Sequence, residues 1–209
     1  MELYDCQMAP NPRRARIFIA EKNLDIPKRE LNILEGENLK EEYLKINPWG
    51  LLPSLVLDDG TVITEAPCIF QYLESLHPEP NLLGEDPIEK AQIQAWERFS
   101  EFNGSQAIGE FFRNQAEPLA DRAMPGFSGL AQIPELVERG KKRASWYYDQ
   151  LETRLAQSKY VGSDRYSAAD ITALCTIDFG KRVGLAYPEN FENISRWHEE
   201  VSKRPATQV

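Results

Sequence analysis

The sequence predicts an α/β domain followed by an all-α domain, and three observations support this fold class. Residues 1–78 mix short β-like segments with helical ones. After residue 87 the β-like patterns disappear and only helical spacing remains. The segment PEPNLLGEDP between the two parts is rich in proline and is typical of a linker. We therefore expect one domain over residues 1–78, a linker over residues 79–87 and a helical domain over residues 88–209.

The first part predicts a small mixed sheet with helices. An apolar run over residues 17–20 indicates a well-buried helix, and Pro12 fits an early helical position, where its missing N–H costs nothing. The Asp59-Gly60 pair joins two apolar runs, which is typical of a hairpin turn. In chain order we expect a strand over residues 2–5, a helix from Pro12, a strand over residues 27–34 and a helix over residues 38–46. A hairpin over residues 54–64 and a helix over residues 65–77 follow.

The second part predicts helices only. Residues 88–112 run without an internal proline and are rich in aromatic side chains, whereas residues 117–133 contain prolines and glycines and predict a loop. Further helices are expected from Pro134 to about residue 156, and over residues 168–181 and 191–203. Ser167 and Asp170 form a capping box in which Asp replaces the usual Glu. A helix cap of this kind contributes about 1 kcal/mol.

Composition and charge exclude several function classes. The 209 residues are 42% hydrophobic and 27% charged, which is the balance of a soluble globular protein. The net charge of −9 disfavours binding to nucleic acid or to an anionic membrane, because both require a basic surface. No apolar run approaches the roughly 18 residues of a membrane span, and the N-terminus shows no secretory pattern. We expect a cytoplasmic protein.

The cysteines and histidines disfavour a metal site. Cys6, Cys68 and Cys175 form no CxxC pair, and two histidines do not complete a zinc pattern. A sparse, odd number of cysteines is typical of a reducing compartment. Cys68 and Cys175 fall on apolar helix faces, so we expect both to be buried and inert.

Two short motifs suggest a binding site in the first domain. In NPWGLLPSL, proline cannot donate to a β ladder, so Pro53 fits best if the bond before it is cis and turns the Leu52 backbone towards an extended ligand. The alternative is an ordinary proline at a strand start. In TEA, Glu65 opens a helix whose free N–H groups suit a ligand carboxylate, with Glu65 taking an ammonium group beside it. The alternative is a routine acidic residue in a first helical turn.

An aromatic set lies on the long helix predicted over residues 88–112. Phe102, Phe111 and Phe112 are followed by Arg113. Core packing is one explanation for such a set. The members nearest the junction between the domains are also suited to line an apolar pocket.

Taken together, these motifs resemble the glutathione S-transferase family, of the cytosolic, bacterial type. The matching segments are NPWGLLPSL, TVITEAPCIFQYLESLHPEPNLL, SAADI and ISRWHEEVSKRPA. They are spread over most of the chain, from residue 47 to residue 206, in the family's order. The resemblance implies a thioredoxin-like domain followed by an all-α domain, usually in a twofold dimer. It also implies that glutathione lies on the first domain as a cosubstrate, without a metal, and that an electrophile binds between the domains. In this arrangement Phe102, Phe111, Phe112 and Arg113 are the candidate electrophile pocket.

The resemblance also implies roles for individual residues in binding glutathione. Pro53 matches the cis-proline, and Leu52 would pair its backbone N–H and C=O with the cysteinyl amide. Glu65 matches the acid that binds the γ-glutamyl group. Ala66 stands where the family usually has serine, so its N–H still binds the carboxylate but one hydroxyl donor is lost, a change of about 1 kcal/mol. Asn38 is a candidate for the glycine end of the tripeptide.

The opening loop, CQMAPNPRRAR, departs from the family pattern because it lacks the usual tyrosine or serine donor. It is similar to the loop of a subgroup that carries threonine or asparagine here, which points to Asn11 as the hydrogen-bond donor to the glutathione thiolate. Lowering a thiol pKa of about 8.5 by two units requires about 2.7 kcal/mol of selective thiolate stabilisation. Cys6 is the rival, because it would form a mixed disulfide with glutathione as in the cysteine-containing classes.

Three functions follow as hypotheses. The first is conjugation of glutathione, bound as a thiolate, to a small hydrophobic electrophile by a homodimer. The second keeps the site but reduces disulfides or peroxides with glutathione. The third is a non-catalytic, transferase-like module that binds proteins, which the missing tyrosine and serine donors and Ala66 suggest.

Overall fold

The computed structural model describes residues 1–209 and contains one mixed sheet of four strands. The strand order is β2-β1-β3-β4; β1 and β2 are parallel, and the other two pairings are antiparallel. This confirms the predicted α/β part with a mixed sheet. The strands are β1 (Glu2–Asp5), β2 (Lys28–Glu30), β3 (Ser54–Val56) and β4 (Val62–Thr64).

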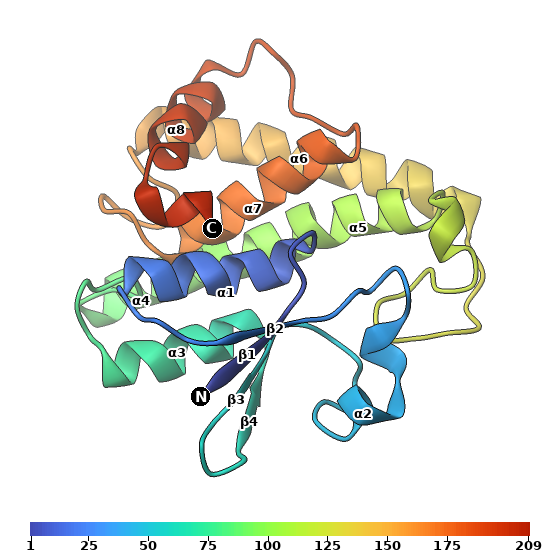
Figure 1. Cartoon of the computed structure of the whole chain (residues 1–209). Coiled ribbons are helices and arrows are strands. Elements are labelled where there is room, and N and C mark those ends of the chain that lie inside the picture. The colour runs from blue at the N-terminus through green and yellow to red at the C-terminus, as the bar shows by residue number, and fades with distance from the viewer.

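Helices flank the sheet and make up the rest of the chain. Figure 1 shows α1 between the sheet and the helical part, with α7 along its other side and the C-terminus close by. None of the helices combines the length and apolar character that crossing a membrane requires. The helices are α1 (Pro10–Glu21), α2 (Glu41–Leu44), α3 (Ala66–Leu76), α4 (Pro87–Phe99), α5 (Gln106–Arg113), α6 (Pro134–Gln157), α7 (Ala168–Arg182) and α8 (Glu192–Ser202).

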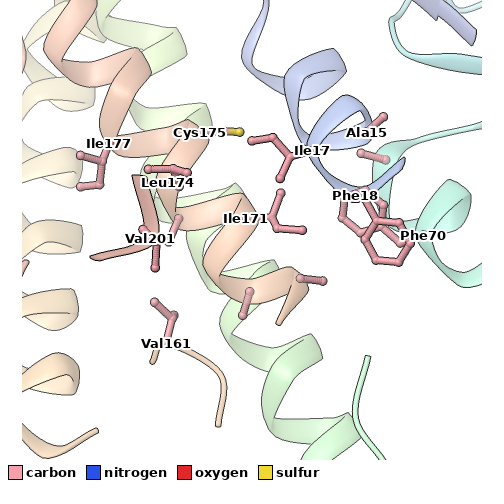
Figure 2. Close-up of a cluster of buried hydrophobic side chains, with 14 of the residues drawn as sticks. Ala15, Ile17, Phe18, Phe70, Val161, Ile171, Leu174, Cys175, Ile177 and Val201 are labelled. Carbon is pink, nitrogen blue, oxygen red and sulfur yellow. The ribbon is translucent and has the colours of Figure 1, made fainter. Parts of the chain in front are cut away.

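Helix α1 is buried on two sides, which joins the two parts of the chain into one hydrophobic core. Figure 2 shows Ile17 pointing towards Ile171 and Cys175 of α7. The next residue, Phe18, stacks on Phe70 of α3 with ring centroids 4.4 Å apart. Offset aromatic stacking adds about 1 kcal/mol to the burial of the two rings. The position of α1 therefore depends on contacts from both parts.

Two predicted elements of the first part are shorter in the structure. The strand predicted over residues 27–34 is limited to Lys28–Glu30, because the Asn32 side chain accepts a hydrogen bond from the Leu34 N–H (3.0 Å) and turns the chain. The helix predicted over residues 38–46 is split into a 3₁₀ turn and α2. Lys40 between them is extended, with φ −76° and ψ 151°.

The long helix predicted over residues 88–112 contains a π-helical segment, Ser100–Ser105, between α4 and α5. Gly104 of this segment packs directly on α6 and α7. A Cβ at Gly104 would lie 2.6 Å from the Thr176 methyl and 2.9 Å from the Tyr147 ring. The glycine therefore permits a close approach that any side chain would block.

The capping box of α7 is confirmed, and its acidic residue also accepts hydrogen bonds from outside the helix. Asp170 is fully buried and accepts from the Ser167 N–H (3.0 Å), but also from the Val161 N–H (2.9 Å) and the Trp197 indole N–H (2.8 Å). Burial raises the pKa of Asp170 to about 6, so the group is still ionised at neutral pH. One carboxylate thus ties α7 to the loop before it and to α8.

We predict that Asp170→Ala lowers the free energy of unfolding by about 3 kcal/mol or more, because several buried donors lose their acceptor at once. Urea unfolding followed by circular dichroism measures the change. Asp164→Ala, in the exposed turn just before α7, is the matched control and should have almost no effect. A loss below 1 kcal/mol for Asp170→Ala would show that the carboxylate acts only as a helix cap.

Candidate functional site

Three segments singled out from the sequence meet at one end of the sheet. Tyr4 of β1 pairs with Ser54 of β3, and Ser54 pairs with Thr64 of β4. In this register the opening loop leaves β1 at the same sheet end at which Pro53 enters β3 and Glu65 leaves β4. Three segments that are far apart in the sequence therefore surround one region.

The opening loop presents the amino end of α1. Among the first three helical residues, Pro10 and Pro12 have no N–H, so only Asn11 offers one. The Asn11 side chain is exposed, and its oxygen accepts from Arg14 Nη1 at 3.3 Å. Because the oxygen is engaged, the amide nitrogen is left to donate outwards. The positive end of the helix dipole lies at the same place.

Arg14 is held by a buried ion-pair network that crosses between the two parts of the chain. Its guanidinium pairs with Glu97 (2.9 Å) and Glu101 (2.6 Å) and lies over the Phe70 ring. Only 1% of the Arg14 side chain is exposed, so the pairs are shielded from water. This network holds the first turns of α1, and with them Asn11, against α4.

The Leu52–Pro53 peptide bond is cis, as the sequence predicts. The Leu51 carbonyl accepts from the Tyr43 hydroxyl and from the Asn47 amide (2.8 Å). By contrast, the Leu52 N–H and C=O make no hydrogen bond within the chain. A buried or half-buried backbone group normally has a partner, so Leu52 offers one donor and one acceptor to an extended ligand.

Glu65 lies immediately before α3 in an unusual backbone conformation, with φ 65° and ψ 126°. A positive φ is rare for a residue with a side chain, and such residues cluster at ligand sites. The Glu65 side chain is exposed and makes no hydrogen bond or ion pair within the chain. The adjacent Ala66 N–H is the first of the helix and points out of its positive end. Together they offer an acceptor for a cation and a donor for an anion.

Asn38 has a contact that the sequence does not reveal. Its amide donates to the Gly50 carbonyl at 2.7 Å and so braces the turn before Leu52 and Pro53. The second N–H of the amide and the side-chain oxygen are left for a ligand.

The three cysteines differ in burial. Cys6 is 1% exposed, and burial, with a smaller contribution from the Glu30 charge, raises the pKa of its thiol. Cys175 is buried as expected, and burial raises its pKa to about 11. The expectation for Cys68 is wrong: it is exposed, because α3 turns a different face inwards. That face carries Ala66, Ile69, Phe70 and Leu73.

The structure separates the aromatic set. Phe102 is 44% exposed and lies under the Arg98 guanidinium, roughly 15 Å along the helix from Phe112. Phe111 is half-buried, and Phe112 packs edge-on against Phe179 of α7, with centroids 5.9 Å apart. Of the three phenylalanines, only Phe112 packs against an aromatic ring of α7.

Arg113 holds a loop. Its guanidinium donates to the carbonyl groups of Ala123 (3.2 Å) and Arg122, in the segment that follows α5. Burial and the nearby Arg122 charge lower the pKa of Arg113.

A cavity of about 40 Å³ lies between the amino end of α1 and the carboxyl-terminal half of α7. Sequence reasoning missed the α7 residues of this cavity because α7 shows the apolar spacing of an ordinary core helix. The cavity is lined by Gln7, Ala9, Pro10, Arg13, Cys175, Asp178, Phe179 and Arg182.

Comparisons with known proteins agree with this arrangement. Residues 3–81 match the glutathione S-transferase N-terminal domain, and residues 107–205 match the glutathione S-transferase C-terminal domain. The chain is 32% identical to glutathione S-transferase 2 of Saccharomyces cerevisiae, over 99% of this chain and 87% of the relative. The chain belongs to the glutathione S-transferase family, a family of transferases.

Solved structures support the same assignment. Gtt2 of Saccharomyces cerevisiae superposes with a TM-score of 0.92 at 31% identity, covering 100% of this chain and 99% of the relative. A Gtt2-class glutathione S-transferase of Vibrio parahaemolyticus gives 0.84 at 34% identity, covering 100% and 96%. The α/β part is therefore the thioredoxin-like domain that the sequence resemblance implies, and the all-α part is the family's second domain.

We predict that iodoacetamide labels Cys68 in the native protein much faster than Cys6 or Cys175. Cys68 is exposed, whereas burial both shields the other two thiols and disfavours their thiolates. Mass spectrometry of peptides after a short pulse at pH 8 measures the labelling. All three should react in denaturant, which is the control. Equal labelling of Cys6 and Cys68 in the native protein would contradict the burial of Cys6.

Proposed function

We propose that the protein binds glutathione as its thiolate and conjugates it to a small hydrophobic electrophile. The observation that carries this proposal is the convergence of Asn11, the Leu52 backbone and Glu65 at one end of the sheet. Each of the three has a donor or acceptor without a partner in the chain, and each suits a different part of the tripeptide.

Binding uses complementary groups along glutathione. The Leu52 N–H and C=O pair with the cysteinyl amide as an added strand would. The Ala66 N–H and the positive end of α3 hold the γ-glutamyl carboxylate, while Glu65 pairs with the ammonium group. Asn38 contributes the second N–H of its amide near the carboxylate at the glycine end. These contacts direct the sulfur towards the opening loop.

Activation lowers the thiol pKa at the amino end of α1. The required stabilisation is about 2.7 kcal/mol for a shift of two units. A hydrogen bond to a charged group contributes about 1.5–3 kcal/mol, and a helix N-terminus about 0.3–1 kcal/mol. The Asn11 amide together with its backbone N–H and the helix dipole is therefore sufficient. The Arg14 charge adds little, since Glu97 and Glu101 offset it.

The reaction then needs no nucleophile from the protein. Glutathione loses its thiol proton to solvent on binding, and the sulfur attacks the electrophilic carbon. An S–C bond forms and the leaving group departs with its bonding electrons. We place the electrophile against Phe112 and Phe179, next to the opening loop.

The burial of Cys6 and its raised thiol pKa count against a mixed disulfide at that residue. This disfavours chemistry that uses Cys6 itself. The alternative in which bound glutathione reduces a disulfide or peroxide uses the same site as conjugation, and the test below distinguishes the two. We extend the proposal to a cytoplasmic homodimer, the location and state that the family resemblance implies.

The direct test is turnover of 1-chloro-2,4-dinitrobenzene with glutathione, followed by the absorbance of the conjugate. Retention on glutathione–agarose tests binding in the same preparation. Activity on hydroxyethyl disulfide without aryl-halide turnover would favour the reductase. Failure to bind glutathione at millimolar concentration would favour the protein-binding module and overturn the proposal.

We predict that Asn11→Ala raises the pKa of bound glutathione by about one unit or more, because the thiolate loses one donor. Thiolate absorbance near 240 nm, titrated against pH in the complex, measures this pKa. Cys6→Ala should leave it unchanged. If Cys6→Ala abolishes turnover instead, the sulfur interacts with Cys6 and our assignment of the loop is wrong.

We predict that Glu65→Ala raises the KM for glutathione roughly tenfold or more, because the ammonium group loses its charged partner. The melting temperature should change little. The Glu65 side chain makes no hydrogen bond or ion pair within the chain, its backbone hydrogen bonds are kept in the variant, and alanine at a positive φ meets the same backbone strain. Asp25→Ala, another exposed acid, is the control and should leave KM unchanged. An unaltered KM in Glu65→Ala would remove Glu65 from the site.

A further inference from the structure

The cavity between α1 and α7 lies beside the place where the sulfur is proposed to bind. Pro10, which lines it, directly precedes Asn11 in the chain. The cavity volume of about 40 Å³ exceeds the roughly 10–15 Å³ that one water molecule needs and is well below the roughly 150 Å³ of a cavity that binds benzene. It therefore accepts a small polar group, such as a carboxylate, but not an aromatic ring. Phe179, on its edge, is the ring that packs against Phe112.

The charges around this cavity are not balanced. Asp178 is fully engaged: one oxygen pairs with Arg13 and the other with His198 at 2.7 Å. Arg182 also lines the cavity. It is exposed and makes no ion pair or hydrogen bond within the chain, and its guanidinium lies over the Phe179 ring, 5.6 Å from the centroid. In a protein with a net charge of −9, this arginine carries an unmatched positive charge at a cavity.

Burial lowers the pKa of Arg182 and the positive charge of Arg13 lowers it further, while the negative charge of Asp178 offsets part of this decrease. Both effects mean that the cation is less stable here than in water, although it stays protonated. A bound anion would offset both, because it supplies an opposite charge that no residue of the chain pairs with Arg182. A guanidinium pairs with a carboxylate through two parallel hydrogen bonds.

We propose that this cavity receives a carboxylate of the second substrate and that Arg182 pairs with it. The inference rests on the proposed function and narrows its substrate class to electrophiles that combine an apolar ring with a carboxylate. The ring lies against Phe112 and Phe179, the carboxylate lies at Arg182, and the electrophilic carbon faces the sulfur at the amino end of α1.

The test compares 4-chloro-3,5-dinitrobenzoate with its methyl ester. In both, the sulfur attacks the carbon that bears chlorine, the S–C bond forms, and chloride leaves with its bonding electrons. The carboxyl group forms and breaks no bond in this step, but it and its ester activate the ring to different extents. Each kcat/KM is divided by the rate of the same compound with free glutathione at the same pH, which removes the difference in intrinsic reactivity.

We expect the wild-type protein to prefer the acid and Arg182→Gln to lower the acid-to-ester ratio roughly tenfold or more, the effect of one charge-assisted ion pair. Arg182→Lys should keep part of the preference, because it retains the charge without the paired geometry. Lys181→Gln is the matched control: it removes the same charge from the neighbouring residue, which lies over Tyr187 and does not line the cavity. Its ratio should stay within twofold of the wild type.

Three outcomes would overturn the inference while the proposed function stands. These are conjugation of the ester with no preference for the acid, an equal fall of the ratio in Lys181→Gln, and a higher KM for glutathione in Arg182→Gln at an unchanged ratio. The last would assign Arg182 to glutathione itself. If the wild-type protein conjugates neither compound and also fails with 1-chloro-2,4-dinitrobenzene, the proposed function falls and this inference falls with it.

Discussion

The position of helix α1 is the constraint on which the rest of the structure depends. One side of α1 packs on α3 through Phe18 and Phe70, and another side packs on α7 through Ile17. Arg14 adds two buried ion pairs to α4 and its π-helical extension. Replacing a buried ion pair by apolar groups is often neutral, but removing one partner costs about 3–5 kcal/mol. The main effect of the network is therefore to fix the position of α1. Its net contribution to the free energy of unfolding is small.

This constraint matters because the proposed chemistry takes place at the amino end of α1. The protein offers an amide, one backbone N–H and a helix dipole there, and none of these groups works unless the helix end is held in place. The sheet register brings the Leu52 backbone and Glu65 to the same region. The first domain thus contributes the proposed glutathione-binding groups, while α4 and α7 hold the helix whose amino end is the proposed sulfur-binding position.

Local motifs made much of the site predictable. The cis bond before Pro53, the helix start after Glu65 and the capping box at Ser167 and Asp170 each depend on a few neighbouring residues. Proline at a strand start and an acidic residue at a helix start have meanings that do not depend on distant contacts. The order of these motifs along the chain was sufficient to indicate the family and the α/β-then-α architecture.

The sequence by itself determined the fold class, the proline and acidic motifs, and the end of α7, because backbone stereochemistry and side-chain spacing act over short distances. Only the tertiary structure decided which helix faces are buried, since this depends on the partner helices. For that reason Cys68 is exposed, Cys6 is buried, Phe102 lies apart from Phe112, and Asn38 braces Gly50. The unmatched charge of Arg182 is also a tertiary property, because Asp178, four residues earlier on the same helix, is already paired with Arg13 of α1 and His198 of α8.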